Sequence, residues 1–181
     1  MYHFYGTYFL FKRKEFNLLF MKVIHKIPPI YTENSKILIL GTIPSPKSRE
    51  NSIFYGNPQN RFWKVLSQIL KEPFPSTNED KISIAKKYNI AIWDVLYSCD
   101  IEGASDNTIK NPVPNNLNKI INQSQIKYIF TTGTKAFQLY NKYCFNDTKI
   151  EAILLPSTSP ANFRYSTEKL CSEYSIILNY I

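Results

Sequence analysis

The stretch GTIPSPKSRENSIFYGNPQNRFW, from Gly41 to Trp63, holds many of the side chains with which this chain could bind or transform a ligand. It follows the apolar run KILIL and leads into RFWKVLSQIL, whose apolar residues recur at helical spacing. Pro44, Pro46 and Pro58 restrict its backbone. A strand, a stiff polar segment and a helix in that order are typical of a ligand site, so this stretch is the first candidate.

The side chains of this stretch, and of LLPSTSPANFRYSTEKL near the C-terminus, suit a planar, polar ligand that lies beside phosphates. Residues 41–60 hold one acid, Glu50, and residues 156–164 hold none. Hydroxyls, amides and aromatic rings can together stack on a nucleobase and hydrogen-bond along its edge. The side chains concerned are Thr42, Ser45, Tyr55, Asn57, Asn60, Ser157, Thr158, Ser159, Asn162 and Phe163.

Several classes of enzyme are disfavoured by what the sequence lacks. It contains neither GxGxxG nor a P-loop motif. The two histidines, His3 and His25, both precede the first predicted strand, which leaves a Ser-His-Asp triad no obvious place to form. Cys99, Cys144 and Cys171 form no CxxC pair, so neither an iron–sulfur cluster nor a structural zinc site is expected. We predict a cytoplasmic protein with reduced thiols, no metal and no cofactor.

The charge of the chain favours a polyanionic partner, although charge alone is weak support for nucleic acid. Lys and Arg number 22 and Asp and Glu 14, which gives a net charge of +8. The uncharged run at the N-terminus ends at Leu10–Phe11, short of the ~20 residues that span a bilayer, and positive charges follow it. We therefore predict that residues 1–20 are a loosely attached extension rather than a membrane anchor or signal; their aromatic content leaves a membrane-surface segment as an alternative.

Four short apolar runs predict buried strands, and helical patterns lie between them. The strands are expected at 36–40, 90–95, 126–132 and 150–155, and the helices at 61–71, 79–88, 115–123, 134–143 and, after Ser166 as N-cap, 167–181. This alternation predicts an α/β fold, a three-layer α/β/α sandwich around a short, mostly parallel four-stranded sheet. Ligands bind at the carboxyl ends of such strands, so segments 41–60, 96–114, 132–135 and 156–164 are expected to form the site.

Four motifs occur in an order that resembles the uracil-DNA glycosylase superfamily. They are GTIPS after the first strand, FYGNPQNRFWKVL, TTGTKAF after the third strand, and LLPSTSPANFRYSTEKL. HKIPPIY and IAIWDVLYSCDIEGASDNTI extend the resemblance over roughly residues 25–180. Within the superfamily the chain looks most similar to the hypoxanthine-DNA (deoxyinosine) glycosylases. NPQNRFWKV is also similar to the mismatch-specific uracil/thymine glycosylases.

This resemblance implies a monofunctional DNA repair glycosylase. Such an enzyme flips a deaminated base, here hypoxanthine first, out of DNA and hydrolyses its N-glycosidic bond, which leaves an abasic site. The expected partner is DNA containing a deaminated base, with no membrane and no metal involved. Residues 21–181 are expected to form a single glycosylase-like domain that acts as a monomer.

The resemblance also carries over a catalytic residue. Many members of the superfamily have Asn or Asp in the first motif, where this chain has Ile43, and an aliphatic side chain cannot orient water. In the hypoxanthine branch a downstream amide takes this role, and Asn60 is the residue that matches it. An Asn carbonyl is a poor base, so positioning and electrostatics must supply most of the assistance. Asn60 has a second interpretation, as the N-cap of the helix that begins near Arg61.

The remaining assignments concern binding. Tyr55 matches the aromatic residue that stacks on the base, and Gly41, Thr42, Ile43, Pro44 and Ser45 complete the predicted base-binding set. The predicted DNA-binding set is Lys47, Ser157, Thr158, Ser159, Asn162, Phe163 and Arg164. Residues 161–163 match the family's wedge that enters the base stack, and Phe163 is the side chain assigned to it. Arg49 and Lys135 are further phosphate candidates. Phe62 and Trp63 are interpreted as core, and Asp94 as a brace rather than a general base.

Three other functions are compatible with polar loops at strand ends. One is a mismatch-specific uracil or thymine glycosylase. Another is a module that senses lesions in DNA without cleaving them, because the usual amide of the first motif is absent. The third is a small-molecule α/β enzyme with TTGTK as a weak phosphate loop. The ordered set of motifs is what favours the glycosylase over these alternatives.

Overall fold

A parallel four-stranded sheet forms the centre of the protein. The computed structural model describes residues 21–181, so the predicted extension at 1–20 lies outside the described residues. The strands β2 (Ile37–Gly41), β3 (Ile90–Asp94), β6 (Tyr128–Thr132) and β7 (Ala152–Leu155) lie in the order β3-β2-β6-β7. All pairs are parallel. Every residue of β2 and β3 is buried, as expected for central strands covered on both faces.

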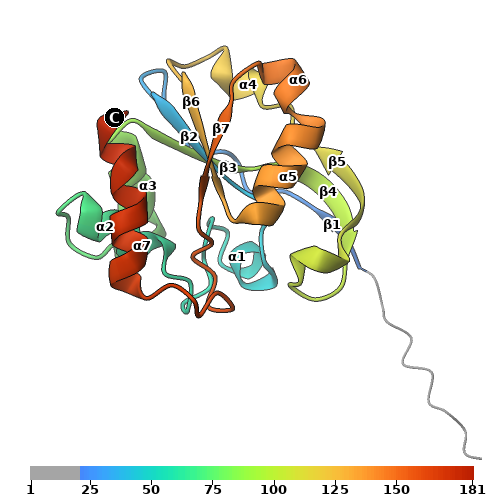
Figure 1. Cartoon of the computed structure of the whole chain (residues 1–181), viewed down its shortest axis with the longest axis horizontal. Coiled ribbons are helices and arrows are strands. Elements are labelled where there is room, and N and C mark those ends of the chain that lie inside the picture. The colour runs from blue at the N-terminus through green and yellow to red at the C-terminus, as the bar shows by residue number, and fades with distance from the viewer. Residues whose placement is uncertain (1–20) are drawn as a thin grey trace, which may run out of the picture.

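Helices cover both faces of this sheet. In Figure 1, α2 (Phe62–Ile69) and α7 (Thr167–Tyr174) lie on one side of the sheet and α5 (Thr134–Tyr143) on the other. The helix α3 (Asn78–Lys87) is offset by one residue from the predicted 79–88, and α4 (Asn118–Ile121) falls within the predicted 115–123. A further short helix, α6 (Phe145–Thr148), follows α5. The predicted α/β/α sandwich around a four-stranded parallel sheet is confirmed.

The sequence explains where the helices begin and what they bury. α2 buries Phe62, Val65, Leu66 and Ile69, which recur at i, i+3, i+4 and i+7. The side chain of Ser166 accepts a hydrogen bond from the backbone of Lys169 and caps α7, as predicted. The α-helix ends sooner than its pattern suggested: a 3-10 helix, η2 (Ser175–Asn179), replaces it after Tyr174.

A second, antiparallel sheet was not predicted. It consists of β1 (Met21–Ile24), β4 (Leu96–Ile101) and β5 (Lys110–Pro114), in the order β1-β4-β5. Segment 96–114, expected to be a strand-end loop, therefore contains two strands and a 3-10 turn, η1 (Asp106–Thr108). The strand β1 also comes before the first predicted strand, so His25 follows a strand instead of preceding all of them.

A short helix was also missed within the first candidate stretch. α1 (Pro46–Glu50) has a proline in its first turn and is capped by Ser45, whose side chain accepts a hydrogen bond from the backbone of Ser48. Proline interrupts a helix interior but suits its first turn, so Pro46 marks a helix start, whereas Pro44 and Pro58 lie outside helices. α1 and the segment from β7 to α7 both lie at the lower end of the sheet in Figure 1, where the parallel strands end.

Candidate active site

A cavity of about 490 Å³ opens at the carboxyl ends of the parallel strands. This volume is in the range of small-molecule pockets. All four predicted segments, 41–60, 96–114, 132–135 and 156–164, contribute to its walls. We call it the strand-end cavity.

The strand-end cavity brings together most of the residues singled out in the sequence. Those that line it are Asn60, the six predicted base-binding residues (Gly41, Thr42, Ile43, Pro44, Ser45 and Tyr55) and four of the predicted DNA-binding residues (Ser157, Thr158, Ser159 and Asn162). Lys47, Phe163 and Arg164 are exposed and do not line it. The lining also includes Asp94, Asp106 and Lys135.

Tyr55 presents an aromatic surface inside the cavity. One face of its ring stacks on Phe62, with centroids 3.8 Å apart and planes 16° from parallel. Its hydroxyl lies 3.0 Å from Oγ1 of Thr132, within hydrogen-bond distance. Burial raises the pKa of the Tyr55 phenol well above its ordinary value, and the charge of Asp94 adds to this rise. The ring is therefore neutral, held at its hydroxyl and supported on one face by a buried aromatic.

Gly41 allows several groups to approach at the end of β2. A Cβ atom on this residue would lie 2.3 Å from Oδ1 of Asp94 and 3.3 Å from the Tyr55 hydroxyl. Any other residue here would displace the Asp94 carboxyl or β2 itself. A glycine is thus needed for close packing at this position.

The amide of Asn60 has a fixed orientation. Its Oδ1 accepts a hydrogen bond of 2.9 Å from the backbone N–H of Phe62, the first residue of α2. The N-cap of α2 is Arg61 rather than Asn60, and it makes no side-chain cap bond, so the predicted N-cap was one residue early. A carbonyl oxygen has two lone pairs, so Oδ1 can accept a second hydrogen bond while it holds the Phe62 N–H. The contact that stabilises the helix start also orients the predicted catalytic group.

A buried His–Asp pair lies behind the cavity, and sequence reasoning missed it. Nε2 of His25 lies 3.1 Å from Oδ2 of Asp94, and the two residues are 6% and 4% exposed. Burial raises the pKa of the Asp94 carboxyl, while the hydrogen bond from His25 opposes the rise. The pair joins the end of β1 in one sheet to the end of β3 in the other. The contact agrees with the interpretation of Asp94 as a brace. His25 opens the HKIPPIY segment of the resemblance, but nothing in that segment indicated that Asp94 would be its partner.

Asp106 is a second carboxyl in the cavity. Burial raises its pKa, and the charge of Asp94 adds to the rise. A hydrogen bond with the Thr42 side chain and the charge of Lys135 act in the opposite direction. Two carboxyls that interact in this way hold a proton to higher pH than an isolated one. Acidic groups thus lie within the cavity of a chain whose net charge is +8.

Lys47, Phe163 and Arg164 are exposed residues that lie within two positions of lining residues in the sequence, and we call them the rim. The ring of Phe163 is 88% exposed. Lys47 is exposed but lies 2.8 Å from Glu50, so it is paired with an acid in this structure. Arg164 is exposed next to Phe163.

Gly133 allows a close approach at the end of β6. Its φ of +94° is one that a residue with a side chain would adopt only under strain, and the Ser157 side chain lies against it.

Arg61 is the other residue that sequence reasoning missed. Its guanidinium donates to backbone carbonyls between Thr158 and Tyr165, in the loop that connects β7 to α7. Nothing in the local sequence distinguishes this arginine from an exposed basic residue, because its partners lie about a hundred residues further along the chain.

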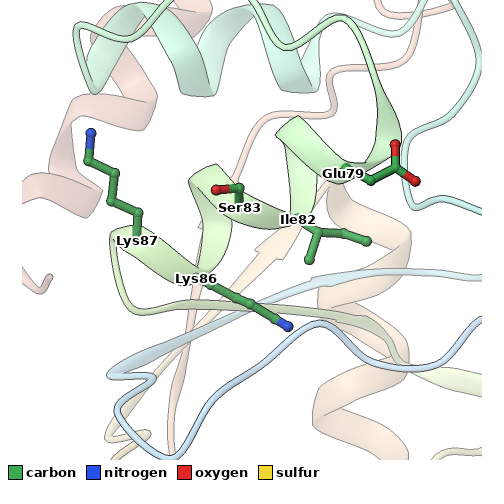
Figure 2. A pocket seen from close by; sticks show the side chains of 5 residues that line it. All are labelled: Glu79, Ile82, Ser83, Lys86 and Lys87. Carbon is green, nitrogen blue, oxygen red and sulfur yellow. The ribbon is translucent and has the colours of Figure 1, made fainter.

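Another hollow lies along α3, away from these residues. It is lined by Glu79, Ile82, Ser83, Lys86 and Lys87, none of which lines the strand-end cavity. Figure 2 shows that the side chains of Lys86 and Lys87 point away from one another. No aromatic ring lines this hollow and its polar groups do not converge, so we assign the functional site to the strand-end cavity.

The described part of the chain offers neither a metal site nor a membrane-spanning helix. Within residues 21–181, no group of three or more His, Cys, Asp or Glu side chains is arranged to hold a metal ion. No helix in the same range has the length and apolar character needed to cross a membrane.

Comparison with known proteins identifies the family. The model of the uracil DNA glycosylase superfamily matches residues 28–181. A hypoxanthine DNA glycosylase from Methanosarcina acetivorans is 31% identical over 144 residues, which are 78% of this chain and 90% of that protein. Its counterpart from Methanosarcina barkeri is 32% identical over 111 residues, 60% of this chain and 70% of the relative.

A solved structure agrees with these matches. The solution NMR structure of a candidate uracil DNA glycosylase from Methanosarcina acetivorans superposes with a TM-score of 0.72 at 28% identity, over 87% of this chain and 99% of the other. The chain belongs to the uracil DNA glycosylase superfamily, as its motifs predicted. It is a DNA glycosylase, and DNA is its substrate.

Proposed function

We propose that this glycosylase removes hypoxanthine from DNA by hydrolysis and leaves an abasic site. The observation that carries the proposal is the identity to curated hypoxanthine DNA glycosylases, 31% over 90% of one of them. The chemistry of the strand-end cavity supports it, since the predicted catalytic amide and base-binding aromatic line the same cavity.

In this proposal the flipped base stacks on the free face of Tyr55. Phe62 supports the opposite face, so the ring does not have to move when the base arrives. Backbone groups of Gly41 and Thr42 meet the polar edge of the base, beside the side chains of Ile43 and Pro44. Stacking between a base and an aromatic ring contributes about 1–3 kcal/mol, which offsets part of the cost of unstacking the base from DNA.

Asn60 then acts on water. The C1′–N9 bond breaks with its electron pair moving to N9, and positive charge develops on the sugar, as in other glycoside hydrolyses. The second lone pair of Asn60 Oδ1 holds a water molecule, which adds to C1′ and loses a proton. The departing purine gains a proton, so atoms and charge balance. Because the amide is already oriented by its contact with Phe62, little reorganisation is required at the moment of reaction.

Cleavage by water predicts a monofunctional enzyme that forms no Schiff base. Lys135 lines the cavity and is the amine to test. We expect no protein–DNA adduct to be trapped by borohydride and full activity in EDTA. Trapping that disappears in Lys135→Ala would contradict a purely hydrolytic mechanism.

One panel of substrates tests the proposed function. Purified protein is incubated with oligonucleotides that carry hypoxanthine, uracil, xanthine or a G·T mismatch, and alkali then reveals abasic sites. Release of hypoxanthine is expected. Release of uracil or thymine alone would instead identify a pyrimidine glycosylase, and binding without release would identify a lesion sensor.

Three further properties belong to the same proposal. The protein acts as a monomer, residues 21–181 fold as a single domain, and the enzyme works in the cytoplasm. Sedimentation of the purified protein, alone and with a lesion duplex, tests the first of these. A sedimenting mass that corresponds to two chains per duplex would contradict action as a monomer.

A further inference from the structure

Arg61 directs its donors at the backbone of one loop. Nη2 donates to the carbonyl oxygens of Ser159 and Asn162, both at 2.9 Å, and Nη1 donates to the carbonyl of Tyr165. Nε lies 3.5 Å from the carbonyl oxygen of Thr158, and the backbone N–H of Arg61 donates to the same oxygen at 3.1 Å. Because its donors are directed at carbonyls, this arginine is poorly placed to bind a phosphate.

The loop that Arg61 contacts, residues 157–165, has no helix or strand of its own. Its internal hydrogen bonds are short-range. Asn162 Nδ2 donates to the carbonyl of Ser157 at 2.9 Å, and the Asn162 backbone N–H donates to the carbonyl of Ser159 at 3.0 Å. These bonds close a turn but do not fix where the turn lies. The guanidinium ties this turn to the start of α2.

Phe163 lies between two of the tethered residues. Its ring is 88% exposed, and it directly follows Asn162, which lines the strand-end cavity. Arg61 holds the carbonyls of Asn162 before it and Tyr165 after it. Apolar side chains that enter DNA between base steps unstack and kink the duplex. An exposed ring on a loop held at both sides is suited to such insertion, because little conformational freedom is lost when the DNA arrives.

We propose that Arg61 is a positioning residue: its guanidinium holds the 157–165 loop so that Phe163 enters the base stack as the target base leaves. The proposal rests on the proposed function. Arg61 directly follows Asn60, whose amide is fixed by the same helix start. The wedge and the water-orienting amide therefore share one rigid support, and extrusion of the base and hydrolysis of its bond are geometrically coupled.

A double-mutant cycle tests this inference. Single-turnover release of hypoxanthine from duplex DNA is measured for wild type, Arg61→Ala, Phe163→Ala and the double variant. Misplacement by about 1 Å can lower a rate about 10²-fold, so we expect a loss of that order in Arg61→Ala. Since Arg61 acts through Phe163, the double variant should be no slower than the slower single variant.

Two further variants separate geometry from charge and from folding. Arg61→Lys keeps the charge and most of the packing, but its single nitrogen lacks the planar fork with which Nε, Nη1 and Nη2 reach carbonyls from Thr158 to Tyr165, so it should also be slow. Lys64→Ala removes an exposed charge one turn along α2 and should react at the wild-type rate. The dependence of duplex affinity on salt should be the same in Arg61→Ala as in wild type, because no phosphate contact is lost.

The outcomes are distinct. The positioning role is overturned if the losses of the single variants multiply in the double variant. It is also overturned if Phe163→Ala or Arg61→Lys cleaves at the wild-type rate. A salt slope of binding reduced by about one in Arg61→Ala would overturn it as well. If the wild-type enzyme releases no hypoxanthine, the proposed function itself fails. Wild-type activity with an unaffected Arg61→Ala rejects the positioning role alone.

Discussion

The floor and the rim of the strand-end cavity differ in how their side chains are held. On the floor, Tyr55, Asn60 and Asp94 are buried or half-buried, and each has a partner: Thr132, the backbone of Phe62, and His25. On the rim, Lys47, Phe163 and Arg164 are exposed. A group that is already oriented can act on the reacting bond without reorganising, whereas an exposed charge mainly attracts and aligns DNA.

This difference makes the comparison testable. Substitutions on the floor should change the rate of cleavage or the preference for a lesion, and should depend little on salt. Substitutions of rim charges should change the affinity for any duplex and its dependence on salt.

The largest effect is expected for Asn60→Ala. Loss of one positioned group at a reaction centre costs about 10²–10³ in rate, and DNA affinity should stay within a few-fold of wild type. Single-turnover release and equilibrium binding measure the two quantities. Asn60 also accepts a hydrogen bond from the first N–H of α2, so the variant should lose about 1 kcal/mol of stability.

Thr77→Ala is the matched control for that loss of stability. Thr77 caps α3, which does not line the cavity, so its loss should lower stability by a similar amount and leave the rate unchanged. If Asn60→Ala cleaves within a few-fold of wild type, or if both variants are equally slow, Asn60 has no part in the reaction.

Tyr55→Ala should weaken binding to lesion DNA by about 1–3 kcal/mol and should change binding to undamaged duplex much less. The reason is that only a flipped base reaches the ring. Tyr55→Phe keeps the ring and loses the hydrogen bond to Thr132, so it should cost about 1 kcal/mol of stability and retain the preference for the lesion. Titrations of both duplexes provide the comparison. Equal losses for both DNAs in Tyr55→Ala would assign this residue to the core.

Asp106→Asn should stabilise the protein at neutral pH, by an amount smaller than the effects above. The pKa of Asp106 is raised in the folded state, so the folded protein binds a proton that the unfolded chain has released. Stability therefore falls as pH rises from the ordinary carboxyl pKa through the raised one. The difference in unfolding free energy between Asp106→Asn and wild type should grow between these two pKa values and stay constant above them. Urea unfolding at a series of pH values measures it.

Asp80→Asn provides a control of opposite sign. Hydrogen bonds from Thr77 lower the pKa of Asp80, so its carboxylate stabilises the folded state above the ordinary carboxyl pKa and loses this contribution as pH falls through the lowered value. The variant should be less stable than wild type at neutral pH. If Asp106→Asn is instead less stable than wild type at neutral pH, the ionised Asp106 carboxyl stabilises the folded state and the prediction is wrong.

The smallest effect is expected for Arg164→Ala. Loss of one phosphate contact should weaken lesion and control duplexes alike and should reduce the salt slope of binding by about one. Measurements at two or more salt concentrations check this. A loss of affinity confined to lesion DNA would indicate that Arg164 acts on the flipped base rather than on the phosphates.

Much of the architecture followed from local sequence. The apolar runs of strand length predicted the parallel sheet. Apolar residues at helical spacing, and Ser166 as an N-cap, predicted the main helices. These signals could be read because each arises within a few residues of the chain. The same alternation predicted which segments meet at the carboxyl ends of the strands, and all four of them line the cavity. The order of the motifs then pointed to the family.

What the sequence could not supply were contacts between distant segments. The antiparallel sheet pairs β1 with β4, about seventy-five residues later, and this pairing brings His25 to Asp94 across 69 positions. No local pattern encodes such a pairing, since it depends on how the two sheets pack. The missed helix α1 has a different cause: a proline that ends one helix can begin another, and only the surrounding structure decides between them.

Local sequence specified the parallel strands, the main helices, their order and the residue types at the strand ends. Which of these groups are held, and by which partners, depended on tertiary packing. It assigned Arg61 to the backbone of a loop some hundred residues away, and it oriented Asn60 through the first N–H of α2. The physical reason is that periodicity reports which face of an element is buried, whereas a hydrogen bond between distant residues forms only after the elements have packed.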